Sequence, residues 1–210
     1  MRGMRMAALA VAAVLMLIPA TGSAQEVKSG AKGFMANVHL NGTSVSSDDL
    51  ESESGAGVGV DLGYGFTQAL MIFVSADAAR LTADDEFLEG EYGLAHIDVG
   101  GRFSFANPAR AFVPYVQAGF TGLGVGMEIE SEDENNGIDI ELQGRGFTVG
   151  GGVLYFFSPK FAADLGLKWT SGTFTEGEVD NEPFEFEDDE EVDMTSMRFN
   201  LGISWFPMAN

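Results

Sequence analysis

The sequence contains no cysteine at any of its 210 positions, so disulfide bonds cannot contribute to its stability. After residue 24 it also lacks any run of about 18 consecutive apolar residues, so no later segment has the composition of a transmembrane helix. An exported chain without disulfides depends on a large apolar core or on a membrane for its stability.

Basic residues are scarce: the chain has 11 Lys and Arg against 32 Asp and Glu, which gives a formal net charge of −21. Nucleic-acid binding depends on Lys and Arg side chains that neutralise phosphate groups. The charge balance therefore excludes nucleic acid from the partners that we expect.

The N-terminus has the pattern of an export signal. Arg2 and Arg5 precede an apolar stretch at 7–20, and Gly22 to Ala24 are the small residues that a signal peptidase requires. We expect residues 1–24 to be a cleaved signal peptide rather than a buried N-terminal helix. Because no cysteine follows the cleavage site, we expect no lipoprotein anchor.

Alternation of apolar and small or polar residues recurs along the rest of the chain. In GFTVGGGVLYFF, residues 146–157, Val149 and Val153 fall on one face and Thr148 and Gly152 on the other. A period of two residues is typical of a β-strand with two different faces. The alternation predicts eight strands, at 33–41, 55–66, 69–78, 94–105, 112–122, 146–157, 162–170 and 197–206.

The predicted connections alternate in length. Short turns are expected at 67–68, 106–110 and 158–160, and long loops at 42–54, 80–91, 126–143 and 171–194. Short turns at one end and long loops at the other describe an up-and-down antiparallel sheet, with both termini at the short-turn end.

One face of every predicted strand is apolar and free of charge, which favours a membrane over water as its surroundings. Aromatic residues gather at the short-turn end, among them Phe103, Trp205 and Phe206, with a thinner group that includes Tyr92 at the other end. Such aromatic belts are typical of membrane interfaces. Since no backbone group can stay unpaired in lipid, the sheet must close.

The fold class that follows is all-β: a closed eight-stranded antiparallel up-and-down transmembrane β-barrel with short periplasmic turns and long acidic extracellular loops. We expect residues 25–30 to be an N-terminal periplasmic segment, 31–207 to form the barrel and 208–210 to be a C-terminal tail.

PYVQAGF at 114–120 and MRFNLGISWF at 197–206 look like the fifth and last strands of a known group. The chain resembles the family of small eight-stranded outer-membrane barrels, similar to the OmpA transmembrane domain, OmpX and the opacity-type surface proteins. This resemblance implies a bacterial outer-membrane location, contact with outer-membrane lipid and lipopolysaccharide, and assembly as a monomer. Family members usually end on an aromatic residue, whereas here residues 207–210 follow Phe206.

Charged residues of the predicted strands point into the barrel. Eight strands leave an interior that side chains fill, and a buried charge needs a partner. We therefore predict an ion-pair network inside the lumen, with the histidines His39 and His96 beside it. Its members are Asp61, Asp77, Asp98, Arg102, Asp164, Lys168 and Arg198. The network is interpreted as a structural plug, with a gate or narrow ion path as the alternative.

The predicted loops carry most of the acidic residues. Clustered carboxylates bind hard cations such as calcium, and SEDENNGIDIELQ has a spacing similar to that of an EF-hand loop. The candidate cation ligands are Glu132, Glu134, Asn136 and Asp139, although Gln143 stands where that loop requires Glu. The alternative is a solvated acidic fringe, so any metal stays undetermined.

The function predicted from these patterns is a non-enzymatic outer-membrane protein with a structural or surface-exposed role and no cofactor. Two histidines face inward, but no spacing joins them to Ser75 or Ser104 in a nucleophilic arrangement. The alternatives are a small pore for ions or small solutes, a divalent-cation-binding surface protein, and a soluble eight-stranded binding barrel.

Overall fold

The computed structural model describes residues 32–47, 50–85, 88–105, 111–129, 138–179, 182–185 and 192–209. Within these ranges the chain forms strands and turns, and none of them contains a helix that could cross a membrane. The strands are β1 (Gly33–Ser47), β2 (Leu50–Gly65), β3 (Leu70–Asp85), β4 (Leu88–Ser104), β5 (Phe112–Ile129), β6 (Ile138–Ser158), β7 (Phe161–Val179), β8 (Glu182–Glu185) and β9 (Val192–Trp205).

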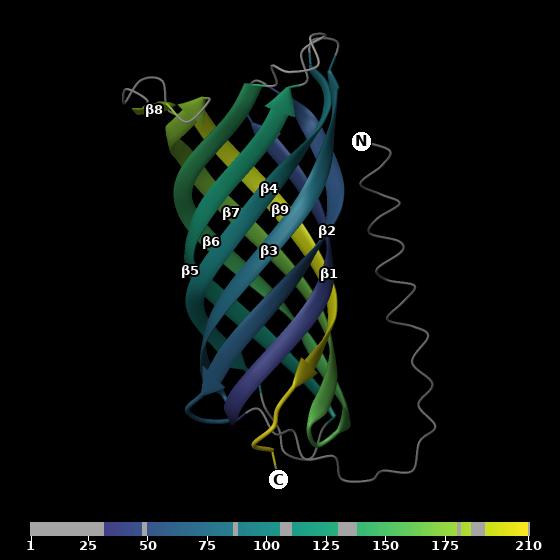
Figure 1. Ribbon diagram of the computed structural model, residues 1–210. Helices are drawn as coiled ribbons and strands as arrows, with labels where there is room; N and C mark the ends of the chain where they lie inside the picture. Colours follow the sequence, from purple (N-terminus) through teal and green to yellow (C-terminus); the bar gives the residue numbers. More distant parts are fainter. Residues whose placement is uncertain are drawn as a thin grey trace.

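Eight of these strands close into a barrel (Figure 1). The order is β6-β5-β4-β3-β2-β1-β9-β7, and β6 also pairs with β7, so the ring has no open edge. Every pair is antiparallel. The predicted closed eight-stranded up-and-down barrel is confirmed. The short β8, which pairs with β7 alone, lies within a predicted loop and was not predicted as a strand.

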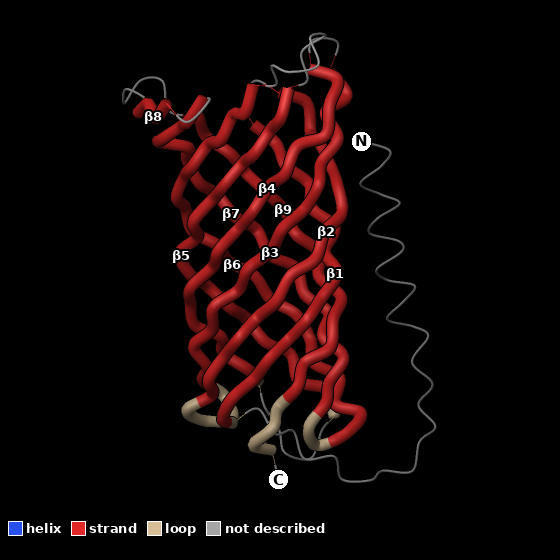
Figure 2. The backbone as a smooth tube through the Cα atoms, viewed as in Figure 1, coloured by secondary structure: helices blue, strands red, loops and turns tan. Residues whose placement is uncertain are grey.

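The strands are longer than predicted, so the expected long loops at 42–54, 80–91, 126–143 and 171–194 are wrong for most of their residues. Only residues 48–49 separate β1 from β2, and only 86–87 separate β3 from β4. Figure 2 shows these strands continuing to the end of the barrel opposite the short turns, which we call the far end.

An apolar belt surrounds the outside of the barrel. Its side chains alternate along each strand with buried ones and are between 36% and 83% exposed. They include Val38, Leu40, Val58, Val60, Leu62, Ile72, Val74, Ile97, Val99, Phe120, Leu201 and Ile203. A sheet that shows its apolar face outward is suited to lipid rather than water.

The polarity of the two faces inverts beyond this belt. At the far end Leu81, Leu94 and Phe174 are buried inside, while Arg80 and Thr82 are exposed outside. This arrangement is the one expected for a barrel wall in water, and it explains the short predicted strands. Outward-facing apolar residues, which identify the predicted strands, end with the belt. The alternation of buried and exposed residues continues beyond it.

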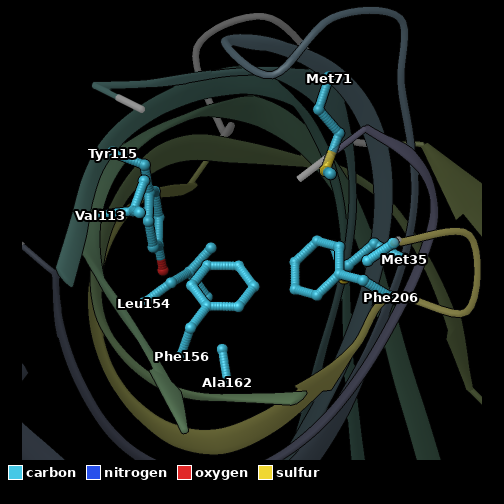
Figure 3. Packing of buried hydrophobic residues seen from close by; sticks show 9 residues of the cluster. Met35, Met71, Val113, Tyr115, Leu154, Phe156, Ala162 and Phe206 are labelled. Atoms are coloured by element: carbon cyan, nitrogen blue, oxygen red, sulfur yellow. The ribbon is translucent and has the colours of Figure 1, made fainter. Parts of the chain in front are cut away.

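The short-turn end of the lumen is filled by an apolar cluster, which we call the lower apolar cluster. Its members are Met35, Met71, Val113, Tyr115, Leu154, Phe156, Ala162, Phe206 and Ala209. The Phe156 and Phe206 ring centroids are 5.3 Å apart, and Figure 3 shows the two rings beside each other within the lumen. The prediction of Phe206 as an interfacial aromatic is therefore wrong, because its side chain is fully buried. Tyr92 also differs from its predicted place, since it packs against the apolar cluster inside the far end.

The far end of the lumen holds a second apolar cluster, the upper apolar cluster. It consists of Ala79, Leu81, Leu94, Leu123, Phe174 and Met194. Buried polar residues occupy the length of lumen between the two clusters. The interior is thus built of three layers, apolar at both ends and polar in the middle.

Candidate functional site

The polar layer of the lumen contains all seven charged residues that the sequence predicts inside. Each is at most 6% exposed, and they come from β2, β3, β4, β7 and β9. They face inward because they share the period of the buried face, which in these strands runs through small and polar residues.

Four of these residues form a group that we call the Arg198 cluster. Arg198 Nη1 contacts Asp77 Oδ2 and lies 3.1 Å from Asp98 Oδ2. Lys168 Nζ lies between the same two carboxylates, 3.0 Å from Asp77 Oδ2 and 3.3 Å from Asp98 Oδ2. Two cations therefore face two anions, which offsets the cost of burying each charge.

The second group, the Arg102 cluster, lies next to the lower apolar cluster. Arg102 Nη2 is 3.5 Å from Asp61 Oδ2, and Nη1 is 3.8 Å from Asp164 Oδ2. The guanidinium stacks 4.2 Å from the centroid of the Tyr115 ring, and Tyr115 Oη donates a hydrogen bond of 2.8 Å to Asp164 Oδ1. Lys168 Nζ, 3.8 Å from Asp61 Oδ1, joins this cluster to the Arg198 cluster.

Three threonines that the sequence analysis did not single out complete the polar layer. Thr121 Oγ1 donates to Asp98 Oδ1 at 2.8 Å, and Arg198 Nη2 donates to Thr170 Oγ1 at 2.7 Å. Thr148 lies between Thr121 and Thr170 and bonds to both. Their inward register was visible in the sequence, but without the structure nothing indicated that β5, β6 and β7 place them side by side.

His39 is a further buried residue of this layer. Asn37 Nδ2 donates to Ser204 Oγ at 2.9 Å, so the Asn37 Oδ1 that faces His39 Nδ1 at 2.7 Å is an acceptor. The other ring nitrogen, Nε2, faces the carboxylate Oδ1 of Asp77. Both ring nitrogens of His39 thus lie within hydrogen-bond distance of an oxygen atom.

The buried ionisable groups of the layer lie close to groups of opposite sign. The buried acids are Asp61, Asp77, Asp98 and Asp164, and the buried bases are Arg102, Lys168 and Arg198, with the His39 ring against Asp77. This pairing offsets the cost of burial, since an unpaired ion is strongly destabilising in a sealed interior.

His96 has a different environment. Its Nε2 lies 2.9 Å from Ser196 Oγ, a contact that the sequence analysis did not foresee. His96 is 2% exposed and Ser196 is fully buried. Although a serine beside a histidine is the beginning of a nucleophilic site, this pair is enclosed by the wall and by the polar layer.

A cavity of about 10 Å³ lies inside the Arg102 cluster, which is room for a single water molecule. Three buried atoms without a hydrogen-bond partner among the described residues belong to its lining residues: Asp61 Oδ1, Arg102 Nη1 and Asn200 Oδ1. Two of these atoms are acceptors and one is a donor, which matches a water molecule that donates two hydrogen bonds and accepts one.

The predicted cation ligands fall almost wholly outside the description. Glu132, Glu134 and Asn136 lie in 130–137, outside the described residues, and Asp139 pairs through its backbone with Glu128 at the start of β6. In the part of the chain that the structure describes, no three acidic or histidine side chains are grouped so that they could hold a metal ion.

Comparison with known proteins gives one family. The family model of the outer membrane protein beta-barrel domain matches residues 9–206, which is nearly the whole chain. No curated protein sequence matches.

Solved structures share the architecture at low sequence identity. Neisserial surface protein A (NspA) is 17% identical with a TM-score of 0.63, and the match covers 84% of this chain and 99% of that chain. OprG from Pseudomonas aeruginosa is 10% identical with a TM-score of 0.57, covering 85% and 97%. Ail, the attachment invasion locus protein of Yersinia pestis, is 14% identical with a TM-score of 0.51, covering 83% and 99%. At these identities the likeness concerns the fold alone.

Proposed function

We propose, because this chain belongs to the outer membrane protein beta-barrel family and lies in the bacterial outer membrane, that it is a closed, non-enzymatic barrel with a structural or surface-exposed role. The observation that carries this proposal is the three-layered filling of the lumen. An ion that entered from either end would meet an apolar cluster before it reached the polar layer.

The polar layer supports the same function. Its charged groups are paired with one another rather than lined up along a water-filled path, as the contacts of Arg198 with Asp77 and Asp98 illustrate. The cavity in the Arg102 cluster has room for one water molecule, which is far too little for a hydrated ion. We infer that the lumen contributes stability and does not conduct.

The proposed orientation places the short turns, the start of β1 and the end of β9 on the periplasmic side and the far end outside the cell. The segments 42–54, 81–91, 126–143 and 171–194 contain no Lys or Arg, so the part exposed outside is strongly acidic. A surface of this kind keeps the protein soluble at its outer end and repels anionic partners.

An enzymatic role has little support in this arrangement. His96 and Ser196 are the described histidine and serine that lie closest to a nucleophilic geometry, and both are buried beneath the wall. A substrate would have to displace the polar layer to reach them. Assays for hydrolysis of lipids and peptides are expected to show no activity above that of a control with the refolding detergent and no protein.

Single-channel recording in a planar bilayer tests the proposal. The refolded protein is expected to show no openings, with or without millimolar calcium. Steady openings would overturn the closed-lumen proposal in favour of the small pore for ions or small solutes. Openings that calcium closes would favour the divalent-cation-binding alternative, in which Glu132, Glu134, Asn136 and Asp139 are the first residues to replace.

A further inference from the structure

Three buried polar atoms without a hydrogen-bond partner among the described residues belong to the lining of one cavity. Asp61 Oδ1, Arg102 Nη1 and Asn200 Oδ1 come from β2, β4 and β9, and each of these residues is at most 8% exposed. The other unpartnered atoms in the described part of the chain, Asn41 Nδ2 and Arg198 Nε, belong to residues that do not line this cavity. Because a buried polar atom without a partner is costly, the three atoms indicate a bound molecule that satisfies them.

The Arg102 guanidinium is held in place by its other contacts. Its Nε donates to Gln117 Oε1 at 3.0 Å, and its Nη2 lies 3.5 Å from Asp61 Oδ2. The group also stacks 4.2 Å from the centroid of the Tyr115 ring, and Figure 3 shows the Tyr115 side chain inside the barrel. Arg102 cannot turn its Nη1 towards a new protein partner without giving up these contacts.

Two ion pairs beside the cavity are too long for direct hydrogen bonds. Lys168 Nζ is 3.8 Å from Asp61 Oδ1, and Arg102 Nη1 is 3.8 Å from Asp164 Oδ2. All four residues line the cavity. In the Arg198 cluster, by contrast, Arg198 Nη1 and Lys168 Nζ approach carboxylate oxygens to 3.1 and 3.0 Å. Polar groups separated by more than about 3.5 Å are joined well by a bridging water molecule, so the two clusters differ in how their charges meet.

The lining determines the chemical class of the bound molecule. A cation would face the donor Arg102 Nη1 and the Lys168 ammonium, and an anion would face the carboxylates of Asp61 and Asp164. The three unpartnered atoms require a neutral molecule that donates two hydrogen bonds and accepts one. The cavity volume of about 10 Å³ limits that molecule to the size of one water.

From these observations we infer that the Arg102 cluster holds one resident water molecule and that the Arg198 cluster is dry. The water donates to Asp61 Oδ1 and Asn200 Oδ1 and accepts from Arg102 Nη1. Asn200 is its positioning residue, because it supplies the second acceptor without adding a charge. The lower and upper apolar clusters lie on either side of the polar layer, so the water is enclosed when the barrel closes. The inference goes beyond the proposed function, since it concerns how the ionic layer is joined rather than what passes through it.

The test uses the full-length barrel, labelled with ¹⁵N-arginine and refolded in detergent micelles. Paired NOESY and ROESY spectra detect cross-peaks between guanidinium protons and water, and in ROESY a bound water and proton exchange give opposite signs. The signals are assigned by comparison with Arg102→Lys and Arg198→Lys. A bound-water cross-peak is expected at the Nη protons of Arg102 and none at those of Arg198. Absence of the cross-peak at Arg102, or equal cross-peaks at both arginines, would overturn the inference.

Three variants test the role of Asn200. Asn200→Leu has nearly the same size but no acceptor, so the Arg102 cross-peak is expected to disappear. Asn200→Ser keeps an oxygen atom and is expected to retain it. Thr43→Val is the matched control, because Thr43 is a buried polar residue of the lumen that does not line the cavity.

An unchanged cross-peak in Asn200→Leu, or an equal loss in Thr43→Val, would also overturn the inference. If Asn200→Leu does not fold, the comparison of Arg102 with Arg198 in the wild type still decides the outcome, and Asn200→Ser still tests the role of the oxygen.

Failure of this inference can be distinguished from failure of the proposed function. A barrel that is silent in the planar bilayer but shows no bound-water cross-peak would contradict the resident water alone. A barrel that conducts and still shows the cross-peak at Arg102 alone would contradict the closed lumen and leave the water site intact.

Discussion

His39 and Asp77 contact each other inside the barrel next to Gly59 of β2, which has no side chain. The imidazole Nε2 faces the carboxylate Oδ1, and a Cβ atom built on Gly59 would collide with both groups. The contact between His39 and Asp77 thus depends on Gly59, because a side chain at that position would occupy the same space.

The first prediction concerns the contact between His39 and Asp77. His39→Leu removes one buried partner of the Asp77 carboxylate, so it is expected to lower the free energy of unfolding by about 3 kcal/mol. Urea titration of the refolded barrel measures the change. A variant as stable as the wild type would contradict a contribution of this contact to stability.

Gly59→Ala gives the second prediction. The added methyl group would displace His39 or Asp77, so the free energy of unfolding is expected to fall by about 1–3 kcal/mol. Gly42→Ala is the matched control, since a Cβ at Gly42 meets nothing within 4 Å. The same urea titration measures both, and a Gly59→Ala protein no less stable than the control would show that the niche is dispensable.

The third prediction separates a buried ion pair from its members. Arg198→Met leaves Asp77 and Asp98 each short of one cation and is expected to cost about 3–5 kcal/mol. Adding Asp98→Asn removes one of the stranded charges, so the double variant is expected to be more stable than Arg198→Met alone. A double-mutant cycle from unfolding curves gives the coupling energy, and simple additivity would count against a direct contact.

Phe206 carries the fourth prediction. Its ring is fully buried in the lower apolar cluster, so Phe206→Ala is expected to cost about 3–5 kcal/mol. Its neighbour Trp205 is 44% exposed on the outer face, and Trp205→Ala is expected to cost less. If the cluster also seals the lumen, brief openings are expected for Phe206→Ala in the planar bilayer and none for Trp205→Ala.

Much of the fold was predictable because the membrane imposes a simple rule on each strand. Val149 and Thr148 fall on opposite faces whatever their neighbours are, so period two identifies the strand and the absence of charge on one face identifies the lipid. The rule also indicates which ionisable residues lie inside. It therefore led to Asp98, Arg102 and Arg198 without any knowledge of their partners.

Other features depend on information that a single strand does not contain. Leu81 and Phe174 are apolar but face inward, because the wall at the far end is surrounded by water and the rule is reversed there. Phe206 follows directly after the last strand, and its direction is set by the Lys160 carbonyl, to which its backbone N–H donates at 2.8 Å. The contacts of His39 required the register of three strands, which the sequence does not specify.

The seam between β1 and β9 has a consequence for assembly. It pairs Ala36 of the first strand with Trp205 of the last strand, so these two strands must meet before the ring is complete. Contacts between such distant parts of a chain form slowly, because a long loop must close before any of them is made. Until that moment both terminal strands present unpaired backbone groups, which lipid cannot satisfy. Insertion into the membrane and closure of the ring must therefore proceed together. A chain interrupted before its last strand would form an open sheet, which is not stable in the bilayer.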